Sequence, residues 1–303
     1  MKFYLQQVIL GLPTGVIWAL LATSVVMIYR ASRVLNLAVG GTSMISAYML
    51  FQMANSDRWD IPLAIAVPLT LLFACAMGYV IERFLLRPLR DRPTLVSVIM
   101  TVGILSLCTE VATAVWSVDR QAAPQLLPTQ SVRFLDIAIG LDQILTFVIT
   151  LGIVGSVIYL FRSTSLGVAM RAVSDDRRAA LLMGVPVDRV SSSTWVIGSL
   201  LGAIAGILVA PPLGLTPLGM VFQSIPALAA ALFGGLVSIE LAFAGALVLG
   251  VLWSVLPGVE IFSWRLNDNV IGVQQIAIFA LVIVFLIVRW QALFGSAMRE
   301  EEI

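Results

Sequence analysis

The chain has 303 residues, of which 60% are hydrophobic and 12% charged, and its mean hydropathy is +1.02. Because so few polar residues cannot surround a water-soluble core, the composition predicts an integral membrane protein and leaves no room for a separate soluble domain. The formal net charge of +1 is spread over loop residues without a basic cluster, so we expect no nucleic-acid partner.

Three absences from the sequence narrow the chemistry. There is no histidine, which excludes histidine-based metal sites, Ser-His dyads and histidine proton relays. Cys75 and Cys108 both lie inside apolar runs, where neither a disulfide nor a thiolate nucleophile is expected. The only lysine, Lys2, follows no glycine-rich turn, so the sequence contains no phosphate-binding loop for ATP. We therefore expect no catalytic residue, no metal ligand and no bound cofactor on this chain.

Apolar runs of membrane-spanning length recur along the whole chain, separated by short charged loops. The candidate spans are 8–29, 34–54, 61–86, 95–116, 141–161, 193–213, 221–237, 239–256 and 270–290. Since about 20 helical residues cross a bilayer, these runs predict an all-α polytopic bundle of about eight to ten transmembrane helices. We expect a single membrane domain, 1–303. The seventh and eighth spans are short and separated only around Ser238, so a re-entrant hairpin is the alternative there.

The loops between these spans differ in arginine content. If the long charged loop after the fifth span is placed inside, the outside segments hold only Lys2, Arg58, Arg120, Arg133 and Arg265. Because cytoplasmic loops carry the excess of positive residues, this bias predicts an external N-terminus and a cytoplasmic C-terminus.

Small residues repeat every four positions in the first and sixth spans. These residues are Gly11, Gly15, Ala19 and Thr23, and Gly198, Gly202, Gly206 and Ala210. Such stripes let helix backbones approach closely in lipid, where burying apolar side chains gives no net drive to association. The stripes therefore predict helix packing rather than a ligand site.

The second span contains a polar, glycine-containing break. Asn36, Gly40 and Thr42 lie within it, between two apolar stretches. Discontinuous membrane helices of this kind often line a transport path. We therefore take these three residues as candidates for such a path.

The fourth span carries one polar helical face. Ser106, Thr109, Glu110 and Thr113 follow each other at helical spacing, with Gly103 one turn earlier. An ionisable group inside a span is expensive to bury, so Glu110 is a candidate for facing a cavity. The alternative is interhelical hydrogen bonding near the outer interface.

The longest charged interruption in the sequence, 165–190, predicts one short cytoplasmic helix. Ser174 is a good N-cap, and Asp175 and Asp176 would place negative charge in a first turn. Gly184 suits a left-handed C-terminal cap.

This short helix would have one apolar face, formed by Ala179, Leu182 and Met183. An isolated helix of fewer than about 12 residues is marginal in water, so we expect it to dock against something. Two interpretations remain open: a connector lying on its own protein, and a helix that docks into a partner.

Motifs in this loop are similar to those of ATP-binding-cassette (ABC) importer permeases. Ala179-Ala180 followed by Gly184 resembles the general coupling motif Glu-Ala-Ala, three residues, then Gly, with Arg178 in the Glu position. More specific are Ser165-x-Gly-x-Ala-x-Arg-Ala172 and Leu182-Met-Gly-Val-x-x-Asp-Arg-Val190. Together they resemble the branched-chain amino acid permease family.

Other stretches extend the resemblance over most of the chain. They are Glu82-Arg83 with Arg87-Pro-Leu-Arg90, Thr101-x-Gly103, Asn36-x-Ala-x-Gly40 with Tyr48, and Phe233-Gly-Gly235 with Ser238. The chain departs from the family where Val39 and Gly41 replace the usual His and Glu. This departure leaves the exact solute open.

The resemblance implies a permease subunit in the bacterial inner membrane that carries branched-chain amino acids or a similar small solute across the lipid bilayer. Its implied partners are a second permease, two cytoplasmic ATPases that use ATP and Mg, and an external solute-binding protein. Segment 162–190 would be the coupling loop, with candidate contacts at Arg171, Asp175, Asp176, Ala179, Ala180, Leu182, Gly184, Asp188 and Arg189. The candidate path residues are Asn36, Gly40, Thr42, Thr101, Gly103, Ser106 and Glu110.

The alternative function is an ion-coupled secondary transporter of a small apolar or aromatic acid. Such a transporter usually needs an intramembrane ion site and often shows two similar halves. The sequence offers one deeply placed carboxylate, Glu110, and no clear internal repeat.

Overall fold

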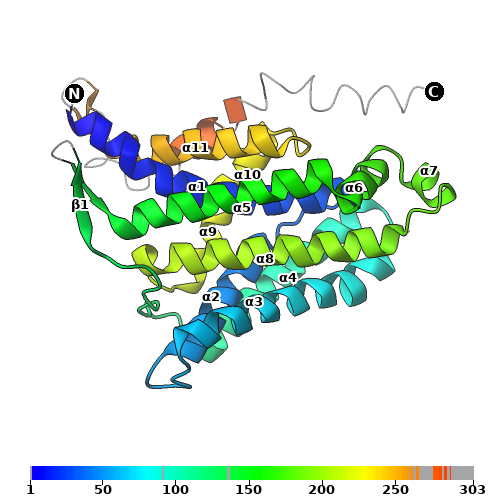
Figure 1. Ribbon diagram of the computed structural model, residues 1–303, viewed down its shortest axis with the longest axis horizontal. Coiled ribbons are helices and arrows are strands. Elements are labelled where there is room, and N and C mark those ends of the chain that lie inside the picture. The colour runs from blue at the N-terminus through cyan, green and yellow to red at the C-terminus, as the bar shows by residue number, and fades with distance from the viewer. Residues whose placement is uncertain are drawn as a thin grey trace.

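The computed structural model describes residues 2–90, 92–134, 137–258, 260–261, 264–265, 276–281, 283–284 and 287. Its long helices run side by side along one direction (Figure 1). They are α1 (Lys2–Ser32), α2 (Val39–Ala54), α3 (Leu63–Val80), α4 (Thr94–Trp116), α5 (Leu141–Ser163), α8 (Val187–Leu213) and α11 (Ile239–Val255). Among these described residues, five segments are long and apolar enough to cross a membrane, and two shorter apolar helical segments accompany them. The predicted all-α polytopic membrane class is confirmed.

Several boundaries differ from the sequence prediction. α2 begins at Val39 and not at 34, because the backbone at Arg33 turns left-handed, with φ 56°, and the segment up to 38 is irregular. α8 begins at Val187, two turns before the predicted span, and includes the charged residues Asp188 and Arg189. The predicted span 270–290 lies largely outside the described residues.

Helix α3 does not stop at Val80. It continues as a π-helical turn, Ile81–Leu86, and then a 3-10 turn, Arg87–Leu89, so that an apolar helix of 27 residues ends in arginines. The wide turn changes the direction in which the side chains after it project.

The seventh and eighth predicted spans form a hairpin that runs along the bundle. α9 (Pro217–Phe222) and α10 (Ser224–Phe233) lead to a turn before α11. At this turn, Arg30 donates to the Val237 carbonyl at 3.1 Å, and Arg162 pairs with Glu240 at 2.7 Å. Arg30 and Arg162 are in the last turns of α1 and α5, so the hairpin reaches that end of the bundle. Two short spans and a re-entrant hairpin both stay predictions for Pro217–Phe233 and Ile239–Val255, which are shorter than the five candidate spans.

Two short helices and a hairpin mark the two ends of the bundle. α6 (Ser165–Asp175) and α7 (Arg177–Leu182) project at one end, and β1 (Ser131–Phe134) pairs antiparallel with β2 (Ile137–Gly140) at the other. The start of α1 lies at the β1 end, opposite α6 and α7 (Figure 1). A further short pair, β3 (Glu260–Ile261) and β4 (Trp264–Arg265), follows a 3-10 turn, Leu256–Gly258.

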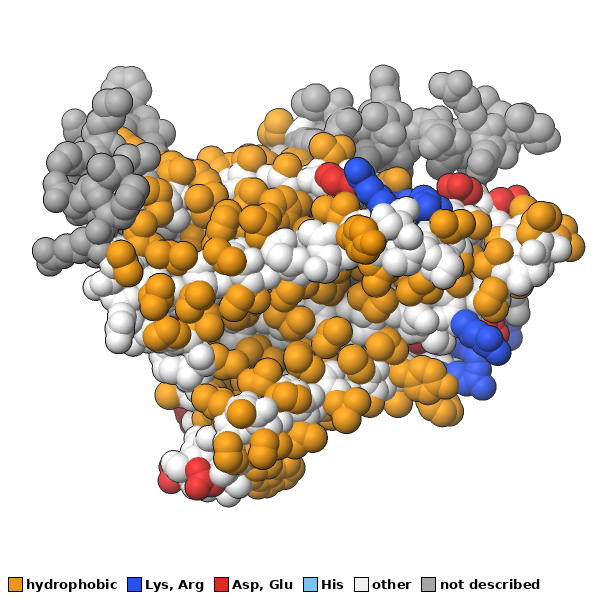
Figure 2. Space-filling model, in the orientation of Figure 1, with side chains coloured by type: hydrophobic (Ala, Val, Ile, Leu, Met, Phe, Trp, Pro, Cys, Tyr) orange, Lys and Arg blue, Asp and Glu red, His pale blue; other side chains and the backbone are white. Residues whose placement is uncertain are grey.

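The surface agrees with a membrane setting. Apolar side chains cover the flanks of the long helices, whereas charged side chains gather towards the two ends (Figure 2). Leu72, Ile99 and Tyr159 are among the large apolar residues that remain more than half exposed on these flanks. Exposed apolar side chains along the helices are stable in lipid and costly in water.

The small-residue stripes lie where helix backbones meet. Gly15 and Gly250 face each other between α1 and α11, and a Cβ added at Gly250 would lie 2.3 Å from the Gly15 Cα. Ser24 of α1 donates to the Gly198 carbonyl of α8 at 2.9 Å. At Gly206 of α8, an added Cβ would lie 2.3 Å from the backbone oxygen of Ser43 in α2. The prediction that the stripes serve helix packing is confirmed.

Replacing Gly206 with Ala tests this close approach. The added methyl group must push α8 away from the α2 backbone, so we expect a loss of about 1–3 kcal/mol of stability. Gly155→Ala is the matched control, because a Cβ at Gly155 on α5 meets nothing within 4 Å. Thermal unfolding of the detergent-solubilised protein measures both. Equal stability of the two variants would contradict the role of Gly206.

Candidate functional site

The segment between α5 and α8 contains two short helices, and not the single one predicted. α6 has its own cap, since Thr164 Oγ1 accepts a hydrogen bond from the Gly167 N–H at 3.2 Å. The predicted N-cap at Ser174 is therefore wrong: Ser174 and Asp175 form the last turn of α6. The sequence prediction missed Thr164, whose hydroxyl starts a helix eleven residues long.

Asp176 is the N-cap of α7. Its Oδ1 accepts hydrogen bonds from the N–H groups of Arg178 at 2.7 Å and Ala179 at 3.0 Å. These two donors hold the pKa of the Asp176 carboxyl below its ordinary value. At the other end, Gly184 has φ +80°, and the N–H of Val185 donates to the Ala180 carbonyl at 3.0 Å. The predicted left-handed cap at Gly184 is confirmed.

The apolar face of α7 points away from the rest of the chain. Leu182 is 88% exposed and Met183 84% exposed, and Ala179 is exposed as well. Only Ala180, at 4% exposure, is buried against the body of the protein. The interpretation of α7 as a connector lying on its own protein does not fit this arrangement, because its apolar residues would have to be the buried ones.

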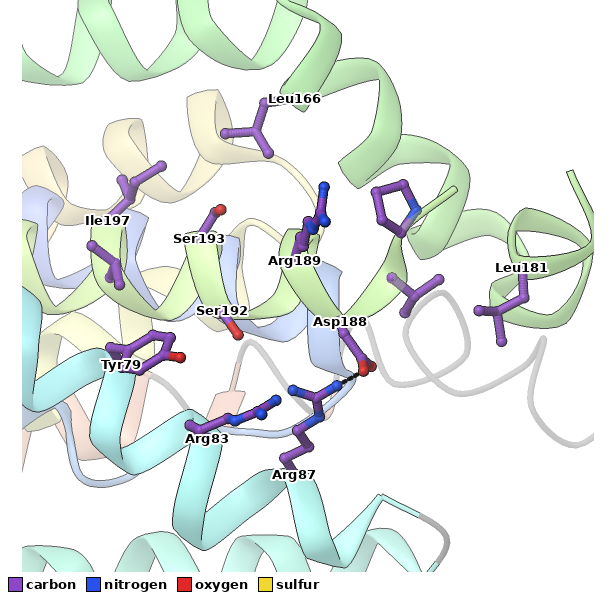
Figure 3. Close-up of a pocket in the computed structure, with 13 residues that line it drawn as sticks. Tyr79, Arg83, Arg87, Leu166, Leu181, Asp188, Arg189, Ser192, Ser193 and Ile197 are labelled. Carbon is purple, nitrogen blue, oxygen red and sulfur yellow. Dashed lines mark ion pairs between the residues drawn. The ribbon is translucent and has the colours of Figure 1, made fainter. Parts of the chain in front are cut away.

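The start of α8 is joined to the end of α3 by a charged network. Asp188 pairs with both Arg87 and Arg90, and Arg90 also pairs with Glu82. The Ser192 hydroxyl donates to the other oxygen of Glu82. Figure 3 shows the pair of Arg87 and Asp188 bridging the two helices. Glu82 is only 1% exposed, so a buried carboxylate and its arginine partner fix α3 against α8 close to α7.

A second arginine contact holds α6 to α5. The guanidinium of Arg171 donates to the Phe161 carbonyl and lies over the Phe161 ring, 5.8 Å from its centroid. Arg30 of α1 lies over the same ring at 4.1 Å. α6 thus contacts α1 and α5, and α7 contacts α6 and α8.

The polar break before α2 is closed by buried hydrogen bonds. The Thr101 hydroxyl of α4 has one proton to donate, to the Val98 carbonyl at 2.8 Å or the Leu35 carbonyl at 3.3 Å, and its oxygen accepts from the Leu37 N–H at 3.3 Å. Asn36 Oδ1 accepts from the Ala38 N–H at 3.0 Å. Thr101 and Asn36 are both buried, and they satisfy backbone groups that the irregular segment leaves free.

The residues after the break pack against other helices. Gly40 lies against Ser224 of α10, where an added Cβ would be 2.6 Å from the Ser224 hydroxyl. Val39 and Thr42 are buried too, and the Thr42 hydroxyl donates to the Val39 carbonyl at 3.2 Å. A Cβ at Gly41 would approach Cys108 of α4 at 3.0 Å. These positions are therefore inside the chain and not on an open surface of it.

The polar face of α4 is exposed, unlike the buried residues at the start of α2. Gly103, Ser106 and Glu110 are all exposed, and a Cβ at Gly103 would meet nothing within 4 Å. Glu110 lies within a 23-residue helix that is apolar enough to span the membrane. A carboxylate there is too costly to leave against lipid tails, so this face requires water or another protein beside it.

The chain also resembles known proteins. A family model described as "Branched-chain amino acid transport system / permease component" matches residues 7–288. The chain belongs to this permease family. The permease is 31% identical to the high-affinity branched-chain amino acid transport system permease protein BraD of Pseudomonas aeruginosa, over 96% of each chain. It is 28% identical to LivH of Escherichia coli, over 82% of this chain and 84% of LivH.

A solved structure, PsaBC from Streptococcus pneumoniae in complex with Fab, is distantly similar to the permease. The TM-score is 0.46 and the identity 16%, over 92% of this chain and 89% of that one. The family assignment therefore rests on the sequence relatives.

The structure separates the predicted site residues of the permease into three groups. Most of the coupling candidates lie on or beside α7, and Arg171 lies within α6. Four path candidates, Asn36, Gly40, Thr42 and Thr101, are buried between helices. The other three are on the open face of α4. In the part of the chain that the structure describes, no group of three His, Cys, Asp or Glu side chains could hold a metal ion.

Asp176→Ala tests the cap of α7. Removing the carboxylate leaves two N–H groups of a six-residue helix without their acceptor, so we expect a loss of about 1 kcal/mol of local helix stability. Amide hydrogen exchange at Arg178 and Ala179 should become several times faster. Asp175→Ala is the matched control, because it removes an adjacent exposed carboxylate that belongs to α6. Unchanged exchange in Asp176→Ala would show that α7 does not depend on this cap.

Proposed function

We propose that the permease is the membrane-spanning subunit of an ABC importer, and that α7 is the helix through which cytoplasmic ATPase subunits drive it. The observation that carries this proposal is the exposed apolar face of α7. Leu182 and Met183 are almost fully exposed at the tip of the bundle, on a helix whose backbone is capped at both ends. A rigid helix with an uncovered apolar face is suited to a groove on a partner.

The contacts around α7 support a mechanical role. The Glu82–Arg90–Asp188 network joins α3 to α8 just beyond α7. Arg171 and the Phe161 carbonyl join α6 to α5. A displacement of α7 by ATPase subunits, which would bind ATP and Mg, therefore reaches three spans through short, charged contacts.

The open polar face of α4 supports a path formed with a second permease. α4 packs on α2 and α9, and its opposite face leaves Ser106 and Glu110 exposed. A second permease across this face would enclose Gly103, Ser106 and Glu110 between two subunits and remove the carboxylate from lipid. The path would then lie between the subunits, with an external solute-binding protein delivering the solute.

The solute we propose is a branched-chain amino acid or a similar small solute. The names of BraD and LivH state branched-chain amino acid transport for those relatives, and the identity to BraD extends over nearly the whole chain. As a member of a bacterial importer, the permease would lie in the inner membrane, with α7 on the cytoplasmic side. The arginine-rich end of the bundle agrees with this orientation.

Replacing Leu182 and Met183 together with Ser tests the coupling proposal. Each side chain is expected to contribute at least about 1 kcal/mol to docking, so the ATPase subunits should bind about tenfold or more weakly. Co-purification of the ATPase subunits and ATP-driven uptake in proteoliposomes measure the effect. The matched control exchanges the two residues, Leu182→Met with Met183→Leu, and should keep both properties. Wild-type binding of the ATPase subunits by the double Ser variant would refute the proposal.

Glu110→Gln tests the path proposal. The substitution keeps the shape and hydrogen-bonding capacity of the side chain but removes its charge. If Glu110 faces the path, uptake should change severalfold while subunit assembly stays normal. Ser156→Ala, on an exposed face of α5, is a control that should leave both unchanged. Lost subunit association with normal transport by the assembled fraction would instead identify Glu110 as an interhelical contact.

A further inference from the structure

A large cleft opens on the flank of the bundle near α6 and α7. Its volume is about 1000 Å³. The first turns of α8 form its floor, Tyr79 and Arg83 of α3 line one side, and Leu166 of α6 lines the other (Figure 3). The cleft faces sideways, where a membrane protein meets lipid, and Leu181 of α7 lines its end at the tip of the molecule (Figure 3).

The cleft carries arginines that the charged network does not neutralise. Arg87 lines it, but the carboxylate of Asp188 pairs with Arg87. Arg83 and Arg189 line it from α3 and α8, and both are exposed. Among the described residues, no ion pair joins either of these two guanidiniums to a carboxylate. The hydroxyl groups of Ser192 and Ser193 add polar atoms to the same floor.

The polarity of the cleft changes along α8. At the loop end it holds Arg189 and the two serines, and one turn further into the bundle it holds Val196 and Ile197. The neighbouring flanks of α3 and α5 are apolar and exposed, with Leu72 and Tyr159 more than 60% accessible. Figure 2 shows apolar side chains covering the flanks of the long helices. Positive charge next to an apolar groove, at the predicted membrane boundary, matches the two parts of a phospholipid.

We propose that this cleft binds an acidic phospholipid from the leaflet that surrounds α6 and α7. The phosphate lies at the α8 floor near the Ser193 hydroxyl, with Arg83 on the α3 side of the cleft and Arg189 on the α6 side (Figure 3), and an acyl chain covers Val196 and Ile197. Guanidinium groups are well suited to phosphate oxygens, and an anion neutralises charges that the protein itself leaves unpaired. The bound lipid contacts both α3 and α8, the same two helices that the Glu82–Arg90–Asp188 network joins.

The test compares lipid binding by the wild-type permease and the double variant Arg83→Gln, Arg189→Gln. Arg178→Gln is the matched control, because it removes an exposed arginine from α7, outside the cleft. The purified full chain is mixed with phosphatidylglycerol, phosphatidylcholine or inorganic phosphate. Native mass spectrometry counts retained lipid, and thermal unfolding measures stabilisation.

We expect the wild type and Arg178→Gln to retain phosphatidylglycerol. The lipid should also raise the Tm of both proteins. In the double Gln variant, both effects should fall at least about threefold. Arg83→Lys with Arg189→Lys keeps the positive charge and should retain most of the binding. Both arginines are exposed, so without lipid the variants should unfold at the wild-type temperature.

Three results would overturn the proposal. The first is equal phosphatidylglycerol binding by the double Gln variant and the wild type. The second is full stabilisation by inorganic phosphate alone, which would indicate a site for a free anion. The third is a double Gln variant that still binds lipid but loses the ATPase subunits from the assembled complex. That result would identify the cleft as a protein interface. Lipid retention and thermal unfolding are measured on the permease alone and without transport, so these two readouts do not depend on the proposed function.

Discussion

Close contact between helix backbones is the constraint on which this bundle depends. In lipid, burying an apolar side chain gains little, because the tails outside are as apolar as the helix inside. The pairing of Gly15 with Gly250 and the contact of Gly206 with the Ser43 backbone therefore do what a hydrophobic core does in a soluble protein. α1 lies at the centre because it offers small residues both to α11 and, around Ser24, to α8.

A second constraint acts where a helix is interrupted. Between Arg33 and Ala38 the backbone is irregular, and where it is buried its polar groups have no water to bind. Thr101 reaches from α4 and Asn36 folds back on its own segment to complete these hydrogen bonds. The break is thus a structural joint between α1, α2 and α4. The residues of this break are buried, whereas the face of α4 around Glu110 is exposed. The sequence pattern alone groups the two regions, because both are polar.

Composition and hydropathy were enough to predict the fold class, most of the spans and the side on which the arginines gather. The left-handed cap at Gly184 was also predictable, because a glycine between helix and proline has few other roles. The two N-caps were not, since Thr164, Ser174 and Asp176 are all good caps in isolation, and the structure uses Thr164 for α6 and Asp176 for α7. The Glu82 network was missed because Asp188 and Ser192 lie about a hundred residues along the chain from Glu82 and Arg90, and no local sequence pattern indicates contacts at that separation.

The π-helical turn at Ile81–Leu86 gives the end of α3 a particular sensitivity to length. Each residue of a helix turns the next by about 100°, and a π turn contains an extra residue compared with an α turn. Deleting one residue from this turn would let it relax to a regular α-helix, yet it would swing Arg87 and Arg90 away from Asp188. Substitutions that keep the number of residues would leave that orientation intact. The spacing between Glu82 and Arg90 is therefore constrained in number as well as in chemistry, so relatives that vary freely in side chains here should still resist insertions and deletions.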